Sequence, residues 1–566
     1  GEFLNRNGVE VRTLTEDVTV GETTYKAGSL VVDMYQAKRN YANAVLWKGA
    51  DASSSGFPGL YSESVSNFPE MRGFDCVPVA VKGAFAGKLS GVTTAFDGAS
   101  QNSGSGAAVV ISNNGSETVR AVNALLDAGK TVGMITEGEY KGDFLVSADN
   151  YASVKDHFVL VANTVSELPA ARAILRPAVY LTGRYAYGDG NRVTDGYYAT
   201  WFKDGFGFRD YQNVHNNGTS NYDVMAYAKQ LGFHIVADPA QASVIVGSTA
   251  LDRGAYGEKA VAAVKGGTPY IASGVTPLGY IKENLLTDLA YNELGEEALH
   301  TVEYPSDSLI TASQKTDEDF TIYTYGCGVI TALPDGAQVL IKAADKDSFI
   351  AGCCLNDEGT PIDGYVEAFQ VTRGGMDLTV FANSIVNRTH QQDDYLFVTN
   401  AIYAKSLTGG ALTQAMLENA MPTGGTAYAS TQEIEVDGKK VTFEAYALKD
   451  EKGNDTNYIK LRDVANVLNG TAAQFEVGWD GSVSITTGKA YTPNGTEMST
   501  PYSGNRAYQE ASAATLVNGS AVELSAILLT DDAGNGYTYY KLRDLGTALG
   551  FTVDWTAERG IFIETH

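Results

Sequence analysis

A histidine and a glutamate three residues apart give this sequence one candidate pair of zinc ligands, His300 and Glu303. A catalytic zinc ion also needs a third ligand and a glutamate that activates the bound water. The segment between them alternates as a β-strand does, and in a strand the first and fourth side chains face opposite ways. The later histidines are His390 and His566. We therefore predict that this chain contributes no metal site.

Ser273 is a candidate nucleophile, because it follows a buried apolar run (269–272) and precedes Gly274. Nucleophilic enzymes often hold their serine or cysteine on a sharp turn between a strand and a helix. The surrounding residues lack the Gly-x-Ser-x-Gly pattern, and the sequence places no histidine to serve Ser273 as a base. We predict no catalytic residue here and interpret Ser273 and Gly274 as a degenerate nucleophile turn.

A third candidate is an aromatic cluster within residues 176–210, where a strand (178–181) leads through a glycine-rich loop into a helix (197–203). Ligands of α/β layers usually lie above such strand ends. Aromatic rings there can stack on a glycan or a peptide, or they can simply pack the helix against the sheet. The residues that would line the cleft are Tyr185, Tyr187, Tyr197, Tyr198 and Trp201.

The charge balance narrows the class of partner. The chain has 67 acidic and 41 basic residues, and its formal net charge is −26. This excess disfavours binding to nucleic acid or to an anionic membrane through bulk electrostatics. No apolar run reaches membrane-spanning length. The four cysteines (Cys76, Cys327, Cys353 and Cys354) form no CxxC motif, so we expect neither a disulfide framework nor a metal cluster.

The elements that must position these residues follow an α/β pattern through three regions, 1–78, 79–175 and 176–408. We expect Ser116 to cap the helix at 117–126. The part of the third region from 309 to 403 is β-rich. The predicted strands are 30–34, 107–112, 131–135, 178–181, 243–246, 269–272 and 379–382, and the predicted helices are 41–47, 117–126, 222–231, 258–264 and 396–404.

An internal repeat follows a linker at 409–430. Repeat 1 (431–488) and repeat 2 (513–566) are joined by a second linker at 489–512. Each copy combines a hairpin signal, a helix that opens with Lys-Leu-Arg-Asp, and a strand pair with a tryptophan. We interpret the recurring Arg-Asp pairs as helix-start ion pairs that support the fold. The predicted class is therefore multidomain α/β plus α+β.

Parts of the chain resemble large secreted bacterial zinc carboxypeptidases. Residues 25–46 and 67–74 are similar to the segment that follows the catalytic domain of those enzymes, and 176–408 resembles their glutamine-amidotransferase-like domain. The matching residues are Tyr25 to Ser29, Gln36, Tyr41 to Leu46, Asn67 to Phe74, Val179 to Leu181, Gly196, Trp201, Gly205 to Phe208, and Phe397 to Ile402. Active amidotransferases carry a cysteine on the turn where this chain has Ser273, so the resemblance implies a non-catalytic relative.

The two repeats resemble the stalk domain named after the N-terminal domain of copper amine oxidases, which is frequent in secreted and surface proteins of Firmicutes. Copper sites are built largely from histidine, cysteine and methionine. No histidine or cysteine lies from Gln391 through Thr565, so we expect no copper. The resemblances together imply flavodoxin-like or amidotransferase-like α/β layers, followed by two small β-rich stalk repeats with one helix each.

The resemblance implies an accessory region that positions substrate for a secreted zinc carboxypeptidase and presents it at the cell surface. The chain opens without methionine on what resembles the last turn of a helix, so we expect 1–78 to be the remnant of an α/β region after a missing catalytic domain. Zinc would belong to that upstream domain, which is the expected partner, and this chain would bind no cofactor. Peptide, cell-wall glycan and self-association remain open. The alternative function is a structural or adhesive bacterial surface protein.

Overall fold

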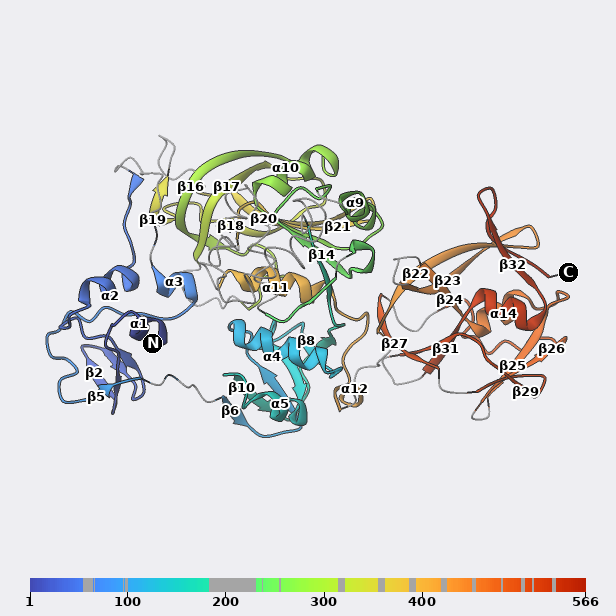
Figure 1. Cartoon of the computed structure of the whole chain (residues 1–566), viewed down its shortest axis with the longest axis horizontal. Helices are drawn as coiled ribbons and strands as arrows, with labels where there is room; N and C mark the ends of the chain where they lie inside the picture. Colours follow the sequence, from blue (N-terminus) through green and yellow to red (C-terminus); the bar gives the residue numbers. More distant parts are fainter. Residues whose placement is uncertain are drawn as a thin grey trace.

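The computed structural model describes residues 1–53, 65, 67–94, 96, 100–182, 231–236, 238–253, 256–313, 321–354, 362–385, 393–418, 425–449, 455–479, 482–499, 504–511, 514–531 and 536–565. Within them the chain is a multidomain α/β protein with several mixed sheets and few helices. An N-terminal region, a central α/β region and a C-terminal β-rich unit follow one another along the long axis (Figure 1).

The N-terminal region is built on a three-stranded sheet, in the order β4-β1-β5, and a hairpin of β2 and β3. The strand predicted at 30–34 ends at Val31, since the carboxylate of Asp33 accepts the amide of Tyr35 and closes a turn. The predicted helix at 41–47 forms as α2. The elements are α1 (Glu2–Arg6), β1 (Arg12–Leu14), β2 (Val18–Val20), β3 (Thr23–Tyr25), β4 (Leu30–Val31), α2 (Arg39–Leu46), α3 (Phe68–Arg72) and β5 (Leu89–Val92).

The next region is a six-stranded sheet in the order β11-β8-β9-β7-β10-β6. The prediction that Ser116 caps α4 is wrong. Gly115 takes the N-cap position in an extended conformation, Ser116 is the first helical residue, and no side chain caps the helix. The elements are β6 (Gln101–Gly104), β7 (Ala108–Ile111), α4 (Ser116–Asp127), β8 (Gly133–Ile135), β9 (Phe144–Ser147), α5 (Ala148–Val154), β10 (Val161–Val165) and β11 (Ala171–Ala173).

The largest sheet joins a parallel half, β13-β12-β14-β15-β21, to an antiparallel half, β20-β17-β16-β18, with β19 paired to β16. The predicted elements form near their expected bounds, except two helices that the structure does not test: the one at 197–203 falls wholly, and the one at 222–231 almost wholly, outside the described residues. The elements are β12 (Ala178–Leu181), β13 (His234–Ile235), β14 (Val244–Gly247), α9 (Gly257–Lys265), β15 (Tyr270–Ser273), α10 (Val275–Asn284), β16 (Ala290–Glu303), β17 (Thr321–Ala332), β18 (Gln338–Ala343), β19 (Phe349–Cys354), β20 (Val366–Arg373), β21 (Met376–Phe381) and α11 (Tyr395–Ala404).

Helix α11 joins the two central sheets into one core (Figure 1). All its residues from Tyr395 to Tyr403 are buried, which is the burial expected of a helix that is apolar on every side. Its polar groups are paired across the junction: the amide nitrogen of Asn113 donates to the side-chain oxygen of Asn400 over 2.7 Å, and the hydroxyl of Tyr403 bonds Asn123 over 2.9 Å. The central sheets therefore share a hydrophobic core.

The C-terminal unit contains an eight-stranded and a four-stranded sheet. The short helix α12 (Gln414–Glu418) precedes it. Repeat 1 supplies β22 (Gly425–Val436), β23 (Lys439–Lys449), β24 (Asp455–Lys460), α13 (Leu461–Val467), β25 (Phe475–Trp479) and β26 (Val483–Thr487). The rest of the unit consists of β27 (Arg506–Glu510), β28 (Thr515–Val517), β29 (Ser520–Val522), β30 (Ala526–Thr530), β31 (Gly536–Lys541), α14 (Leu542–Leu549), β32 (Thr552–Thr556) and β33 (Gly560–Glu564).

The two repeats exchange strands. At the centre β24 pairs antiparallel with β31. The closing strand of each repeat then adds, in parallel, to the opening hairpin of the other, β33 to β22 and β26 to β28. Residues of both copies pack in one hydrophobic core, among them Leu461, Phe475, Tyr540 and Leu545. The copies therefore form a single unit with approximate twofold symmetry.

Among the described residues, no helix is both long and apolar enough to cross a lipid bilayer.

Candidate functional site

Ser273 and Gly274 lie at the carboxyl edge of the parallel half-sheet, where β15 turns into α10. The turn is sharp, and its left-handed residue is Gly274, with φ of 102°. Ser273 precedes the turn as the last residue of the strand and is 2% exposed. Its hydroxyl donates to the carbonyl of Asn383 and accepts the amide of Ile385, both over 3.1 Å.

This geometry suits a structural serine. A nucleophile on a strand-to-helix turn needs an exposed side chain at the turn itself and a base within hydrogen-bond reach. Here the turn residue has no side chain, and the hydroxyl of Ser273 bridges the backbone after β21 instead. The sequence therefore predicted the turn correctly. In the structure the serine hydroxyl is hydrogen-bonded to two backbone groups, the carbonyl of Asn383 and the amide of Ile385.

His300 and Glu303 both lie on β16, and the strand separates them as its alternation requires. His300 is fully buried, with Nδ1 3.4 Å from the hydroxyl of Ser348 and its ring edge-on to Phe349. Glu303 is exposed, opposite Lys342 of β18. No group of three or more metal-ligating side chains occurs within the described ranges.

The other predicted site residues divide in two groups. Tyr185, Tyr187, Tyr197, Tyr198 and Trp201 all lie outside the described residues. Of the cysteines, Cys353 is buried on β19 and Cys76 is exposed. Neither group therefore defines a candidate site in the described part of the chain.

The structure adds a cavity that the sequence did not suggest. It has a volume of about 610 Å³, within the range of small-molecule pockets. Its walls come from the segment after β14, from helix α10 and from the start of β16. The lining residues are Ala250, Val275, Thr276, Gly279, Tyr280, Glu283, Tyr291, Glu293 and Leu294. Because β14 and β15 are neighbouring parallel strands, the cavity adjoins their carboxyl ends.

The cavity combines phenols with carboxylates. Burial raises the pKa of Tyr291, and the carboxylates of Glu293 and Glu283 raise it further. Burial and Asp252 likewise raise the pKa of Tyr280. One cation lies nearby, since the Lys282 ammonium is 5.1 Å from the centre of the Tyr291 ring. The cavity therefore has negative potential at one end and hydrogen-bonding phenols beside it.

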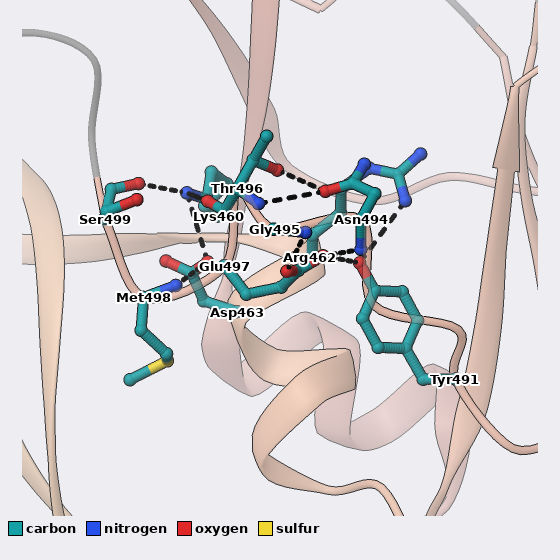
Figure 2. A network of polar contacts seen from close by, with 10 residues as sticks. All are labelled: Lys460, Arg462, Asp463, Tyr491, Asn494, Gly495, Thr496, Glu497, Met498 and Ser499. Carbon is teal, nitrogen blue, oxygen red and sulfur yellow. Dashed lines mark hydrogen bonds and ion pairs between the residues drawn. The ribbon is translucent and has the colours of Figure 1, made fainter.

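A second polar centre lies in the C-terminal unit, where the residues 494–499, which we call the clamp loop, close over the start of α13 (Figure 2). The Lys460 ammonium donates to the carbonyls of Thr496, over 2.7 Å, and of Ser499, and lies 3.1 Å from the Asp463 carboxylate. The same carboxylate oxygen of Asp463 accepts the amide of Met498 over 2.9 Å. The expected partner of Asp463 was Arg462, but Arg462 donates to the Tyr491 hydroxyl instead.

The two carboxyl groups around the clamp loop have pKa values shifted in opposite directions. Burial raises the pKa of Asp463, and the Lys460 ammonium opposes this rise. Burial also disfavours ionisation of Glu497, but hydrogen bonds from the Asn494 amide, the Tyr491 hydroxyl and the Gly495 amide outweigh it and lower its pKa to about 2. All members are supplied by the chain itself, so the network has the features of a structural lock.

No family model and no curated protein matches this chain. Several solved structures show weak similarity, among them the following three. A Thermoplasma acidophilum protein described as part of a GMP synthase is 13% identical, with a TM-score of 0.22, over 32% of this chain and 86% of that one. The exo-β-1,4-mannosidase Op5Man5 from Opitutaceae bacterium strain TAV5 is 12% identical, with a TM-score of 0.23, over 42% of this chain. A β-galactosidase from Bacillus circulans sp. alkalophilus is 11% identical, with a TM-score of 0.23, over 52% of this chain.

The chain spans 36% of each of the two glycosidases. At these TM-scores, the similarities place the chain in none of the three families.

Proposed function

We propose that this chain is the accessory, non-catalytic C-terminal region of a secreted bacterial zinc carboxypeptidase. In this proposal the zinc site belongs to an upstream domain, the central region is amidotransferase-like, and the two repeats are stalk modules that present the enzyme at the cell surface. The resemblance of residues 25–46 and 67–74 to the segment after such catalytic domains supports this assignment.

The observation that carries the non-catalytic interpretation is the turn after β15. Ser273 is buried and hydrogen-bonded to backbone on both sides, and Gly274 occupies the position at the turn itself. A nucleophile that must attack a substrate carbonyl needs an exposed side chain there. The burial of His300 and the exposure of Glu303 likewise argue against a zinc pair on β16. We therefore assign to this region the binding and positioning of substrate for the catalytic domain.

The test is made on the natural product. An antibody raised against this chain would recover the antigen from the culture medium and the cell surface, for measurement of its intact mass and zinc content. We expect a much larger polypeptide that contains zinc and releases C-terminal amino acids from peptides. A stable, zinc-free product no larger than this chain would overturn the proposal.

One observation favours a second function, adhesion to the bacterial wall. Trp479 is the last residue of β25 and Trp555 the last but one of β32, the equivalent strands of the two repeats, and they are 63% and 59% exposed. Indole rings exposed in this way can stack on sugar rings. In a sedimentation assay with purified cell walls, replacing both tryptophans by alanine should abolish retention if the repeats bind wall glycan. Trp47→Ala is the control, because Trp47 is 51% exposed in the N-terminal region.

A further inference from the structure

Repeat 1 shows what the start of a Lys-Leu-Arg-Asp helix can bind. The Lys460 ammonium donates to the carbonyls of Thr496 and Ser499 in the clamp loop (Figure 2). The Asp463 carboxylate accepts the amide of Met498 from the same loop. All three partners are main-chain groups, so the helix start recognises the shape of a folded turn rather than particular side chains.

The turn in the clamp loop is shaped by its own residues. The Glu497 carboxylate accepts the amides of Asn494 and Gly495, both over 2.9 Å. It also accepts the hydroxyl of Tyr491 over 2.5 Å. The segment from 491 to 497 therefore supplies the contacts that fold it, and another polypeptide with this sequence pattern can present the same turn.

Repeat 2 presents the same binding groups to solvent. Lys541, Arg543 and Asp544 occupy the motif positions of the bound residues of repeat 1, and the side chains of Lys541 and Asp544 are partly exposed. Arg543 is exposed, whereas its equivalent Arg462 is half-buried and donates to a tyrosine hydroxyl. One oxygen of Asp544 accepts the amide of Ser525. The start of α14 thus carries the groups that hold the clamp loop in repeat 1.

The approach to the two helix starts is also equivalent. The closing strand of repeat 1 ends at Thr487, whose amide is bound by Asn518. In repeat 2 the amide of Thr565 is bound in the same way by Asp437. The parallel pairings of β26 and β33 agree with this alignment. Thr565 therefore lies where the chain of repeat 1 turns toward its clamp loop.

One set of contacts is not reproduced. The side chain of Asn469 makes two hydrogen bonds of 3.0 Å with the backbone of Tyr491, and Gly550 takes the place of Asn469 in repeat 2. The start of α14 therefore offers fewer contacts, and we expect a partner to bind there reversibly.

We propose that the start of α14 is a docking site for a turn of another protein with the chemistry of the clamp loop. Such a turn offers two carbonyls to Lys541, one amide to Asp544 and a hydroxyl to Arg543. A second copy of this chain is not the expected partner, because in each copy the clamp loop is already held by Lys460 and Asp463. The site is independent of the proposed link to a carboxypeptidase.

The first experiment adds a synthetic clamp peptide, residues 489–499, to the full chain. At 5 mM peptide we expect hydrogen–deuterium exchange of the peptides that cover 536–556 to slow about sixfold, which corresponds to a dissociation constant of about 1 mM. A peptide of the same composition in scrambled order should leave the exchange unchanged. No slowing with the clamp peptide, or equal slowing with the scrambled one, would overturn the proposal.

A graft tests the same site within one chain. A copy of residues 488–499 replaces His566, so that it follows Thr565 as the original follows Thr487. Because the loop is then tethered, we expect exchange over 536–556 to slow by at least about tenfold. Unchanged exchange in a grafted chain with a parental far-UV circular dichroism spectrum would refute the docking site.

Two variants of the grafted chain show which groups hold the loop. Lys541→Met removes the donor to the two carbonyls and should cancel most of the slowing. Lys439→Met, at an exposed lysine of the hairpin in repeat 1, is the matched control and should keep it. Equal slowing in the two variants would contradict the assignment to α14.

The source of the partner is tested on the unmodified chain. Sedimentation equilibrium should show a monomer across the concentration range, because no copy has a free clamp loop. A dimer that Lys541→Met dissociates would mean that a second copy occupies the site, and would overturn the proposed partner.

Discussion

The two copies of the Lys-Leu-Arg-Asp motif have the same sequence and fold but different environments. In repeat 1 the side chains of Lys460 and Asp463 are 4% and 0% exposed and lie 3.1 Å apart under the clamp loop. In repeat 2 the equivalent Lys541 and Asp544 are 39% and 29% exposed, and their charged atoms are 3.8 Å apart. One motif therefore supports a buried ion pair and an open one.

The difference comes from what covers each helix start. In repeat 1 the clamp loop brings two carbonyls to the ammonium and one amide to Oδ1 of the carboxylate, which replace part of the water that the pair loses on burial. The other carboxylate oxygen, Oδ2, is buried without a hydrogen-bond partner among the described residues. In repeat 2 the amide of Ser525 donates to Asp544 over 3.3 Å, and solvent reaches the rest. A buried pair is stabilising only while such hydrogen bonds are complete. The same four-residue motif therefore contributes differently to the stability of the two repeats.

The largest effect should come from breaking the buried pair. Asp463→Asn leaves the Lys460 ammonium buried without a counter-charge, so we expect a loss of about 3–5 kcal/mol in the free energy of opening around α13. Asp544→Asn, the matched change in repeat 2, should cost less than about 1 kcal/mol. Hydrogen–deuterium exchange of the peptides that cover 455–499 and 536–556 measures both. Equal losses in the two copies would refute the comparison.

Replacing both charges tests whether the buried pair itself is favourable. Lys460→Met together with Asp463→Leu removes the charges and fills the space with apolar atoms. Such replacements are often neutral for buried pairs. We expect the double variant to recover at least about 2 kcal/mol of what Asp463→Asn loses, by the same exchange measurement. A double variant as unstable as the single one would mean that the clamp loop depends on the charges for its position.

Acid should loosen the start of α13 through Glu497 of the clamp loop. The pKa of Glu497 is about 2 in the folded chain against an ordinary value of 4.5, so the ionised carboxylate favours the folded state. Its contribution is present above pH 4.5 and is lost as the pH falls toward 2. Protonation of Asp463, whose pKa burial raises, acts in the opposite direction.

The acid effect is measured by exchange of the peptides that cover 489–499 between about pH 2 and 5. Glu497→Gln should reduce the pH dependence of hydrogen exchange in these peptides. It should leave the pH dependence of exchange in the peptides of α14 unchanged. An unchanged profile in this variant would assign the acid sensitivity to another group.

Local sequence patterns predicted much of the central region and little of what joins distant segments. The helix at 117–126 and the strands at 243–246 and 269–272 were found because their apolar residues follow the period of each element. The cap at Ser116 was wrong because a glycine can hold the extended N-cap conformation without a side-chain bond. The strand exchange between the repeats left no local signal, since β26 and β33 pair in parallel with strands from the other copy.

In the candidate sites, too, local features were predicted and contacts between distant segments were not. The turn at Ser273 and Gly274 was predicted, because a strand followed by glycine is a local pattern. The burial of Ser273 was not, because it depends on the backbone after β21, about 110 residues later. The cavity was missed because Tyr280 and Glu283 come from a helix while Tyr291 and Glu293 come from a strand. In the sequence, the cavity is marked by a tyrosine and a glutamate on α10 and by the same two residue types at the start of β16, on either side of the short connection 285–289.

The smallest effects should appear where the copies agree. Asp437 and Asn518 begin the hairpin turns of repeats 1 and 2 with φ of 45° and 51°. Each also binds the end of the other repeat: Asp437 accepts the amide of Thr565 over 3.0 Å, and Asn518 accepts that of Thr487 over 3.1 Å. Asp437→Ala and Asn518→Ala remove equivalent bonds and place alanine in a left-handed conformation. Each should therefore cost about 1–2 kcal/mol. Exchange of the closing strands, β33 and β26 respectively, should rise by similar factors, whereas a large difference between the two would show that the symmetry of the backbone does not extend to its energetics.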